Sequence, residues 1–199
     1  MKMLVQLSDI AEIKLGQTFR GKAEASDCSS GIKLVQIRDI QEGAIDSSFL
    51  SFANIDESKL KVRIADNDLL LPLRGSRYEM CKFKTTEDEI VTTTNQVAII
   101  RPSPEKVNRE YLLWYFNSSS GRSELASMNT GTTVPKINSG QLASFHLPLP
   151  DIEPQNEIVN LYQNWSKQKA LLSEMLANGE VLVEKACGAV LEKSRNSNG

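Results

Sequence analysis

The spacing of hydrophobic and polar positions changes near residue 150 of this chain. Before that point the apolar runs are short and separated by turn residues, which is typical of strands and short helices. The pattern predicts strands at residues 31–37, where apolar and polar residues alternate, at 69–73 and at 97–100. Pro72 indicates that the second strand lies at a sheet edge or is interrupted, because proline lacks the N–H that a central strand uses.

Two helices are predicted in the same part of the chain. One covers residues 7–13, with Ser8 or Asp9 as its cap, and the other runs from 108 to 116, with Asn108 as its N-cap. The mixture of helices and strands predicts an α+β domain over residues 1–150, with a mixed or antiparallel sheet.

From Asp151 onward, apolar residues recur every seven positions, as in a coiled coil. One seam position holds Ile158, Trp165, Leu172, Gly179 and Ala186, and the other holds Leu161, Gln168, Met175, Leu182 and Ala189. We therefore predict a long helical region at 151–193, followed by a disordered polar tail at 194–199. Asn178-Gly179 is a candidate break in this helix. Periodicity alone leaves open whether the stripe packs on its own domain or on a partner helix.

Composition and charge place the chain among ordinary globular proteins. It has 199 residues, 40% of them hydrophobic, and a formal net charge of −2. The charge is uneven: residues 59–84 contain seven basic residues, whereas 151–192 are mainly acidic. Three distant cysteines, Cys28, Cys81 and Cys187, without a CxxC pair indicate reduced thiols. With no signal peptide and no apolar run long enough to cross a membrane, we expect a cytoplasmic protein.

The motifs of common enzymes are missing from the sequence. His146 is the single histidine, so metal sites built on His and Cys and a Ser-His-Asp triad are disfavoured. There is no GxxxxGK[ST] phosphate loop and no GxGxxG turn. A nuclease that binds metal through carboxylates stays formally open, although Glu57-Ser58-Lys59 lacks an upstream Pro-Asp. We therefore expect no catalytic residue, no metal and no cofactor in this chain.

Several stretches together resemble one known family. They are Leu7-Ser8-Asp9-Ile10-Ala11-Glu12-Ile13 followed by Gly16, Leu34-Val35-Gln36-Ile37-Arg38-Asp39-Ile40, Asp68-Leu69-Leu70-Leu71, Thr92-Thr93-Thr94-Asn95-Gln96, Gly131-Thr132-Thr133-Val134-Pro135-Lys136-Ile137-Asn138, and Leu147-Pro148-Leu149-Pro150 before the helix. Their order and spacing resemble the target-recognition domain of type I restriction–modification specificity subunits. The usual subunit carries two such domains and two helices, so the resemblance suggests a half-subunit form or a truncated chain.

The resemblance implies a subunit that reads DNA without catalysing a reaction. Such a subunit directs a partner adenine methyltransferase, which binds S-adenosylmethionine, to a two-part target. A restriction subunit that uses ATP and Mg²⁺ is a further possible partner.

Side-chain chemistry then suggests which residues meet DNA. Arginine pairs with guanine O6 and N7, whereas asparagine and glutamine pair with adenine N6 and N7. Threonine hydroxyls and lysine suit phosphate. The predicted DNA-binding residues are Gln36, Arg38, Arg74, Arg77, Tyr78, Lys82, Asn95, Gln96, Thr132, Thr133 and Lys136. The predicted dimerisation residues are Ile158, Leu161, Trp165, Leu172, Met175 and Leu182.

Two alternatives stay open at this point. One is a protein-interaction or antirestriction module on the same scaffold that does not read DNA. The other is an enzyme in its own right, which the missing cofactor motifs disfavour.

Overall fold

The computed structural model describes residues 4–26, 30–40, 44–45, 47–75, 77–84, 89–130 and 135–196. Contacts divide the chain into two compact units, Met1–Asn156 and Glu157–Gly199. The predicted mixed α+β class with a long C-terminal helix is confirmed.

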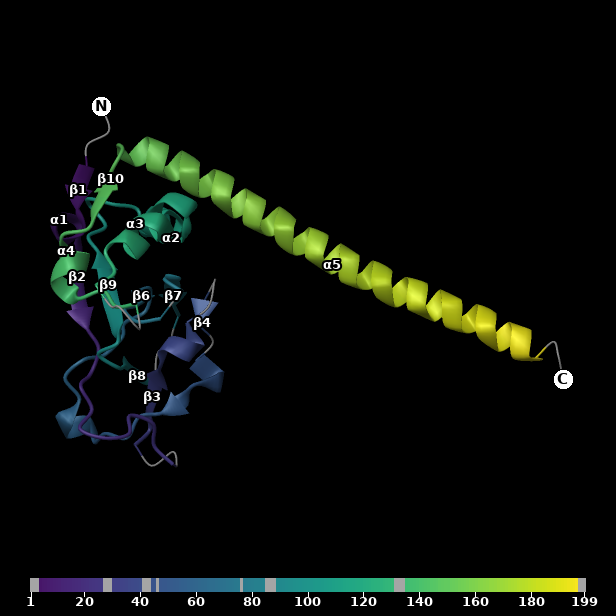
Figure 1. Cartoon of the computed structure of the whole chain (residues 1–199), viewed down its shortest axis with the longest axis horizontal. Coiled ribbons are helices and arrows are strands. Elements are labelled where there is room, and N and C mark those ends of the chain that lie inside the picture. The colour runs from purple at the N-terminus through teal and green to yellow at the C-terminus, as the bar shows by residue number, and fades with distance from the viewer. Residues whose placement is uncertain are drawn as a thin grey trace. The chain divides into compact units, whose positions relative to one another are not determined.

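Ten strands in the described part of the first unit form three sheets (Figure 1). The largest sheet is antiparallel except at β4, and its order is β2 (Ala11–Leu15), β9 (Val97–Pro102), β6 (Leu69–Pro72), β7 (Cys81–Phe83), β4 (Ala44–Ile45). The second sheet has β3 (Ile32–Val35) between the antiparallel β5 (Ser51–Phe52) and the parallel β8 (Ile90–Thr93). The third pairs β1 (Leu4–Gln6) with β10 (His146–Pro148).

All three predicted strands are found. The predicted position of one strand in its sheet and the length of one predicted helix need correction. β6 is the central strand of the largest sheet, and Pro72 is its last residue, opposite Val97. The helix predicted at 7–13 is wrong beyond its first turn, because α1 covers only Leu7–Ile10 and the chain then enters β2. Pairing of Ala11–Leu15 with β9 satisfies backbone groups along five residues, which outweighs the local helical pattern.

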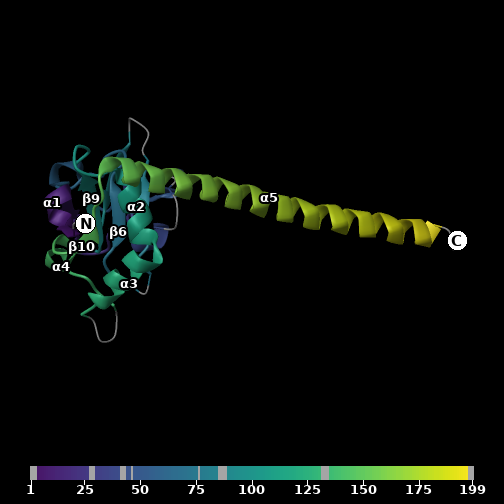
Figure 2. The ribbon, with the colours of Figure 1, turned by 90° about the horizontal axis from the view of Figure 1, so that it is seen from above.

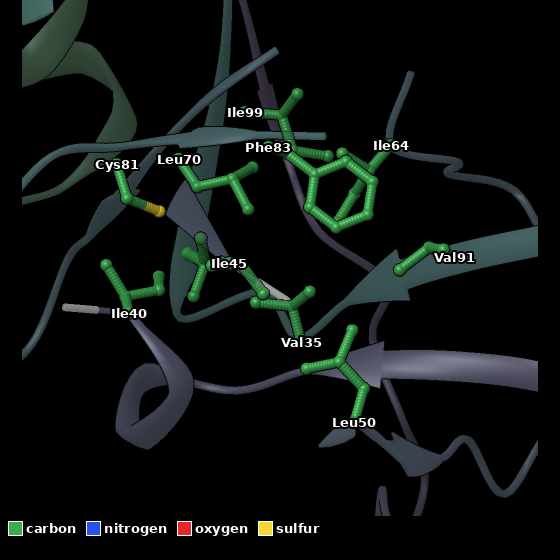
Figure 3. Packing of buried hydrophobic residues seen from close by; sticks show 11 residues of the cluster. Val35, Ile40, Ile45, Leu50, Ile64, Leu70, Cys81, Phe83, Val91 and Ile99 are labelled. Atoms are coloured by element: carbon green, nitrogen blue, oxygen red, sulfur yellow. The ribbon is translucent and has the colours of Figure 1, made fainter. Parts of the chain in front are cut away.

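One hydrophobic core joins the two larger sheets. Figure 3 shows Leu70, Phe83 and Ile99 of the first sheet pointing toward Val35 and Val91 of the second. All five side chains are buried. The core therefore fixes the end of β3 and the end of β8 relative to the strands of the larger sheet.

Short helices lie on either side of β9 in this unit. They are α2 (Arg109–Asn117), α3 (Ser119–Ser127) and α4 (Ser139–Ala143), with α1, and Figures 1 and 2 place α1 with α4 and α2 with α3. The predicted cap of α2 is confirmed, because the Asn108 side chain accepts a hydrogen bond from the Glu110 N–H at 2.9 Å. Gln155 is buried, and its side chain bonds the Asn108 N–H and the Pro150 carbonyl, both at 2.8 Å.

The long helix α5 runs from Ile152 to Asn196 and passes through Asn178-Gly179 without a break. Its first residues, up to Asn156, belong to the first unit. The helix also continues past Ser194, where the polar tail was predicted to begin. Among the predicted seam residues, Leu161, Trp165, Leu172, Met175 and Leu182 are more than half exposed. None of the helices in the described ranges has both the length and the apolar character of a membrane span.

Candidate nucleic-acid interface

The ends of β3 and β8 lie side by side and carry polar residues to the same place. The two strands are parallel, with Val35 opposite Thr93. The buried Thr93 hydroxyl donates to the Val35 carbonyl at 2.8 Å, which ties the strand ends together. Gln36 directly follows the end of β3, and Asn95 lies two residues after the end of β8, so they lie on neighbouring segments.

The turn after β8 brings in two further segments. The Leu73 N–H donates to the Gln96 carbonyl at 2.8 Å, and the Ile137 N–H donates to the Leu73 carbonyl at 3.0 Å. Arg74 and Lys136 form a β-bridge at the same point. Residues from three distant parts of the sequence therefore lie next to one another, and the side chains of Arg74, Gln96 and Lys136 are exposed.

Lys61 joins this surface through the buried side chain of Gln17. The Gln17 Oε1 accepts from the Lys61 N–H, and the Gln17 carbonyl accepts from the Asn95 N–H, both at 3.0 Å. Sequence reasoning counted Lys61 only as part of a basic region, because the sequence separates it from Asn95. We call Gln36, Lys61, Arg74, Asn95, Gln96 and Lys136 the polar edge.

Other predicted residues have different surroundings. Tyr78 is buried, its hydroxyl has no hydrogen-bond partner among the described residues, and burial raises the pKa of this hydroxyl. Lys82 forms an ion pair with Glu110 of α2 at 2.6 Å. Arg77 is exposed, and Thr132 and Thr133 lie outside the described residues.

The basic residues between Lys59 and Lys84 include two that lie at opposite ends of β6 and two others that form ion pairs. Lys82 lies opposite Leu69 at the start of β6, whereas Arg74 follows the end of that strand. Lys59 and Arg63 are paired with Asp56 and Glu57 at 2.8 and 2.7 Å. Positive charges of this segment therefore lie at both ends of β6, and some of them are neutralised by neighbouring carboxylates.

Arg38, another predicted residue, belongs to a polar cluster beside the polar edge. Its Nη2 donates to the Glu24 carboxylate at 3.0 Å and to the Ser51 hydroxyl at 3.1 Å. Sequence reasoning missed Glu24, because a single glutamate in a loop carries no signal of its partners.

The described residues offer little to metal or thiol chemistry. They include no group of three or more His, Cys, Asp or Glu side chains that would hold a metal ion. Burial raises the pKa of the Cys81 thiol to about 12, so it stays protonated. His146 is exposed on β10.

Comparison with known proteins identifies the family. The sequence matches the family described as "Type I restriction modification DNA specificity domain" over residues 2–177. The chain belongs to this family. Family membership confirms the resemblance seen in the sequence and accords with a role in DNA sequence specificity.

Two curated relatives are specificity subunits of type I restriction enzymes. The MjaVIII subunit of Methanocaldococcus jannaschii is 25% identical over 158 residues, which are 76% of this chain and 36% of the relative. The EcoBI subunit of Escherichia coli is 24% identical over 170 residues, which are 84% of this chain and 35% of the relative. The chain thus spans about a third of the length of these relatives.

Solved structures share the fold. One comes from a study of complex assembly and conformational transition in the type I R-M system, with a TM-score of 0.72 and 20% identity over 96% of this chain and 45% of that one. The HsdS subunit of Thermoanaerobacter tengcongensis has a TM-score of 0.64 and 18% identity over 86% of this chain and 39% of its own.

Proposed function

We propose that this chain binds double-stranded DNA in a sequence-specific manner and serves as the DNA-reading part of a type I restriction–modification system. The observation that carries the proposal is the polar edge. Main-chain contacts bring together the five segments that carry its residues, which are far apart in the sequence, and the chain belongs to the DNA specificity family.

The polar edge offers the donors and acceptors that base reading needs. Arg74 suits guanine, whereas Gln36, Asn95 and Gln96 suit adenine. Lys61 and Lys136 at the same edge suit the phosphates that fix the position of the protein on the duplex.

The chemistry on DNA would come from partner subunits. A modification subunit that binds S-adenosylmethionine would methylate adenine, and a restriction subunit would require ATP and Mg²⁺. In this proposal the chain carries no catalytic group and only directs its partners to the target. The curated relatives are named as specificity subunits of restriction enzymes, which supports this division of labour.

The exposed stripe of α5 supports a second part of the proposal. Side chains such as Trp165 and Leu172 are more than half exposed, and burial of such a side chain is worth about 1.5–3 kcal/mol. We infer that two copies pair their α5 helices antiparallel about a twofold axis. The dimer would then read a two-part target arranged as an inverted repeat.

The test is a binding selection from a pool of random-sequence duplexes, with the full chain alone and together with the methyltransferase subunit. We expect a defined two-part motif. Arg74→Ala should relax one position of the motif, whereas Lys136→Ala should weaken binding to all sequences and lower the salt slope by about one. The control is Lys106→Ala, because the Lys106 ammonium binds the Asp9 carbonyl away from the polar edge. Recovery of no motif under either condition would favour a protein-interaction module.

A further inference from the structure

A second polar cluster lies beside the polar edge, and its centre is the carboxylate of Glu24. Glu24 lies opposite Ala53 in an antiparallel bridge, next to β5 and β3. Its carboxylate accepts hydrogen bonds from the Ser51 hydroxyl at 2.7 Å, from Arg38 Nη2 at 3.0 Å and from Gln36 Nε2 at 3.3 Å. Two other segments of the chain, residues 36–38 and Ser51, therefore converge on one acidic side chain.

The cluster is continuous with the polar edge. Gln36 belongs to both, and it directly follows Val35, which is tied to Thr93 at the end of β8. The cluster also lies at the surface, because the side chains of Arg38 and Glu24 are 58% and 30% exposed. A duplex that meets the polar edge is therefore within reach of these side chains.

The partners of Glu24 favour its negatively charged form. The hydrogen bonds from Ser51, Arg38 and Gln36 lower the pKa of Glu24 to about 2. Asp39 adds a second carboxylate, with its Oδ1 at 3.8 Å from Arg38 Nε. Arg38 thus faces two anions, and its positive charge is neutralised.

This neutralisation bears on what the cluster binds. A phosphate would gain little from Arg38 and would be repelled by Glu24. A base edge is uncharged and avoids that repulsion. A carboxylate accepts from cytosine N4, and an arginine donates to guanine O6 and N7, so Glu24 and Arg38 side by side match the two bases of one C·G pair.

We propose that Glu24 is a specificity-determining residue, which holds Arg38 and Gln36 for reading a base pair and prevents them from binding phosphate. The inference rests on the proposed function. It adds to that function by assigning discrimination between base pairs to an acidic residue. Net charge alone would suggest that such a residue weakens DNA binding.

The experiment compares full-chain Glu24→Gln with wild type on two probes: the target recovered from a random-sequence pool, and a random-sequence duplex. Glu24→Gln removes the nearer of the two carboxylates that face Arg38, so that the guanidinium becomes more available to phosphate. Binding to the random duplex should therefore tighten several-fold and gain about one unit of salt slope. Discrimination between target and random duplex should fall about tenfold or more.

Three further variants separate this effect from general charge and from folding. Glu57→Gln removes the same charge and releases Arg63, which is paired with Glu57 at 2.7 Å, and it should leave discrimination unchanged. In an Arg38→Ala background, Glu24→Gln should no longer steepen the salt slope. Glu24→Asp keeps the charge but shortens the side chain, so it should retain the wild-type slope while losing discrimination.

The outcomes are distinct. A wild type that selects a motif, with Glu24→Gln selecting the same motif at the same slope, overturns this inference and leaves the proposed function standing. An equal change in Glu57→Gln overturns it as well, because the effect would then be one of net charge. A wild type that selects no motif overturns the proposed function, and the inference with it.

Discussion

At the scale of single residues, the polar edge depends on one glycine. Gly16 crosses the end of β8 so closely that a Cβ atom there would lie 2.3 Å from the Thr94 carbonyl oxygen and 2.5 Å from that of Thr93. Its N–H donates to the Val97 carbonyl at 3.1 Å, so the backbone cannot move away without losing this bond. Only glycine fits this crossing, which positions the turn that carries Asn95 and Gln96.

We therefore expect Gly16→Ala to destabilise the protein by about 1–3 kcal/mol, as overpacking of a tight contact does. Gly21→Ala is the matched control, because a Cβ atom there meets nothing within 4 Å, and it should change the stability by less than about 0.5 kcal/mol. Urea unfolding followed by circular dichroism measures both. Equal stability of the two variants would show that the crossing yields easily.

The Glu24 cluster predicts a pH dependence of stability. In the folded protein the pKa of the Glu24 carboxyl group is lowered from 4.5 to about 2. The unfolded chain therefore takes up a proton on this group at a higher pH than the folded chain does. The stabilisation is therefore fully present above pH 4.5 and is lost as the pH falls toward 2. Glu24→Gln lacks this carboxylate. The difference in melting temperature between wild type and variant should therefore be constant near neutral pH and narrow steadily below pH 4.5. A difference that widens on acidification would contradict the assigned pKa.

The sequence did not reveal the interaction partners and the burial of the predicted site residues. Side-chain type alone suggested Arg74, Asn95, Gln96 and Lys136, and the structure brings these together. It also suggested Lys82 and Tyr78, one of which pairs with a glutamate 28 positions away while the other is buried. Long-range pairing and burial depend on the whole fold, so composition and spacing do not reveal them.

At the scale of elements, prediction succeeded where a local interaction decides the structure. Asn108 caps α2 because its side chain reaches an N–H two residues ahead, which is visible in the sequence. Residues 11–13 show the opposite case, since their strand conformation comes from pairing with β9, about ninety positions away. The same long-range pairing makes β6 central despite Pro72.

The junction between β10 and α5 depends on Gln155. This buried amide bonds the Asn108 N–H and the Pro150 carbonyl, and neither partner can be replaced by a nonpolar group. Gln155→Leu, of similar size, should leave both backbone groups unsatisfied and cost about 2–4 kcal/mol of stability. Glu153→Leu, at an exposed position nearby, should cost little. Thermal unfolding of both variants provides the comparison, and a fully stable Gln155→Leu protein would contradict this role.

At the scale of the whole molecule, the proposed function requires that the exposed apolar stripe of α5 holds two copies of the chain together as a dimer. Charged residues at its centre should prevent pairing, because they would be buried against apolar side chains. We expect the wild type to sediment as a dimer at micromolar concentrations and Trp165→Asp, Leu172→Asp to sediment as a monomer with an unchanged first unit. The control is Lys167→Asp, Glu174→Lys, which changes charges off the seam. A monomeric wild type would show that the stripe has another partner.

If two α5 helices pair antiparallel, their length sets the distance between the two recognition surfaces. Removal of one heptad, residues 176–182, keeps the apolar residues in phase and shortens each helix by about 10 Å, at 1.5 Å per residue. Since one base pair spans about 3.4 Å, the spacer of the two-part target should shorten by about three base pairs while the half-site sequences stay the same. Insertion of one heptad should lengthen the spacer by the same amount. The motif selected from a random-sequence pool gives both the spacer length and the half-site sequences. Removal of two residues is the control, because at 3.6 residues per turn it rotates the rest of the stripe by about 200°, away from the partner helix, and should abolish dimer formation rather than change the spacer. An unchanged spacer in the heptad deletion would show that something other than the length of α5 sets the distance between the half-sites.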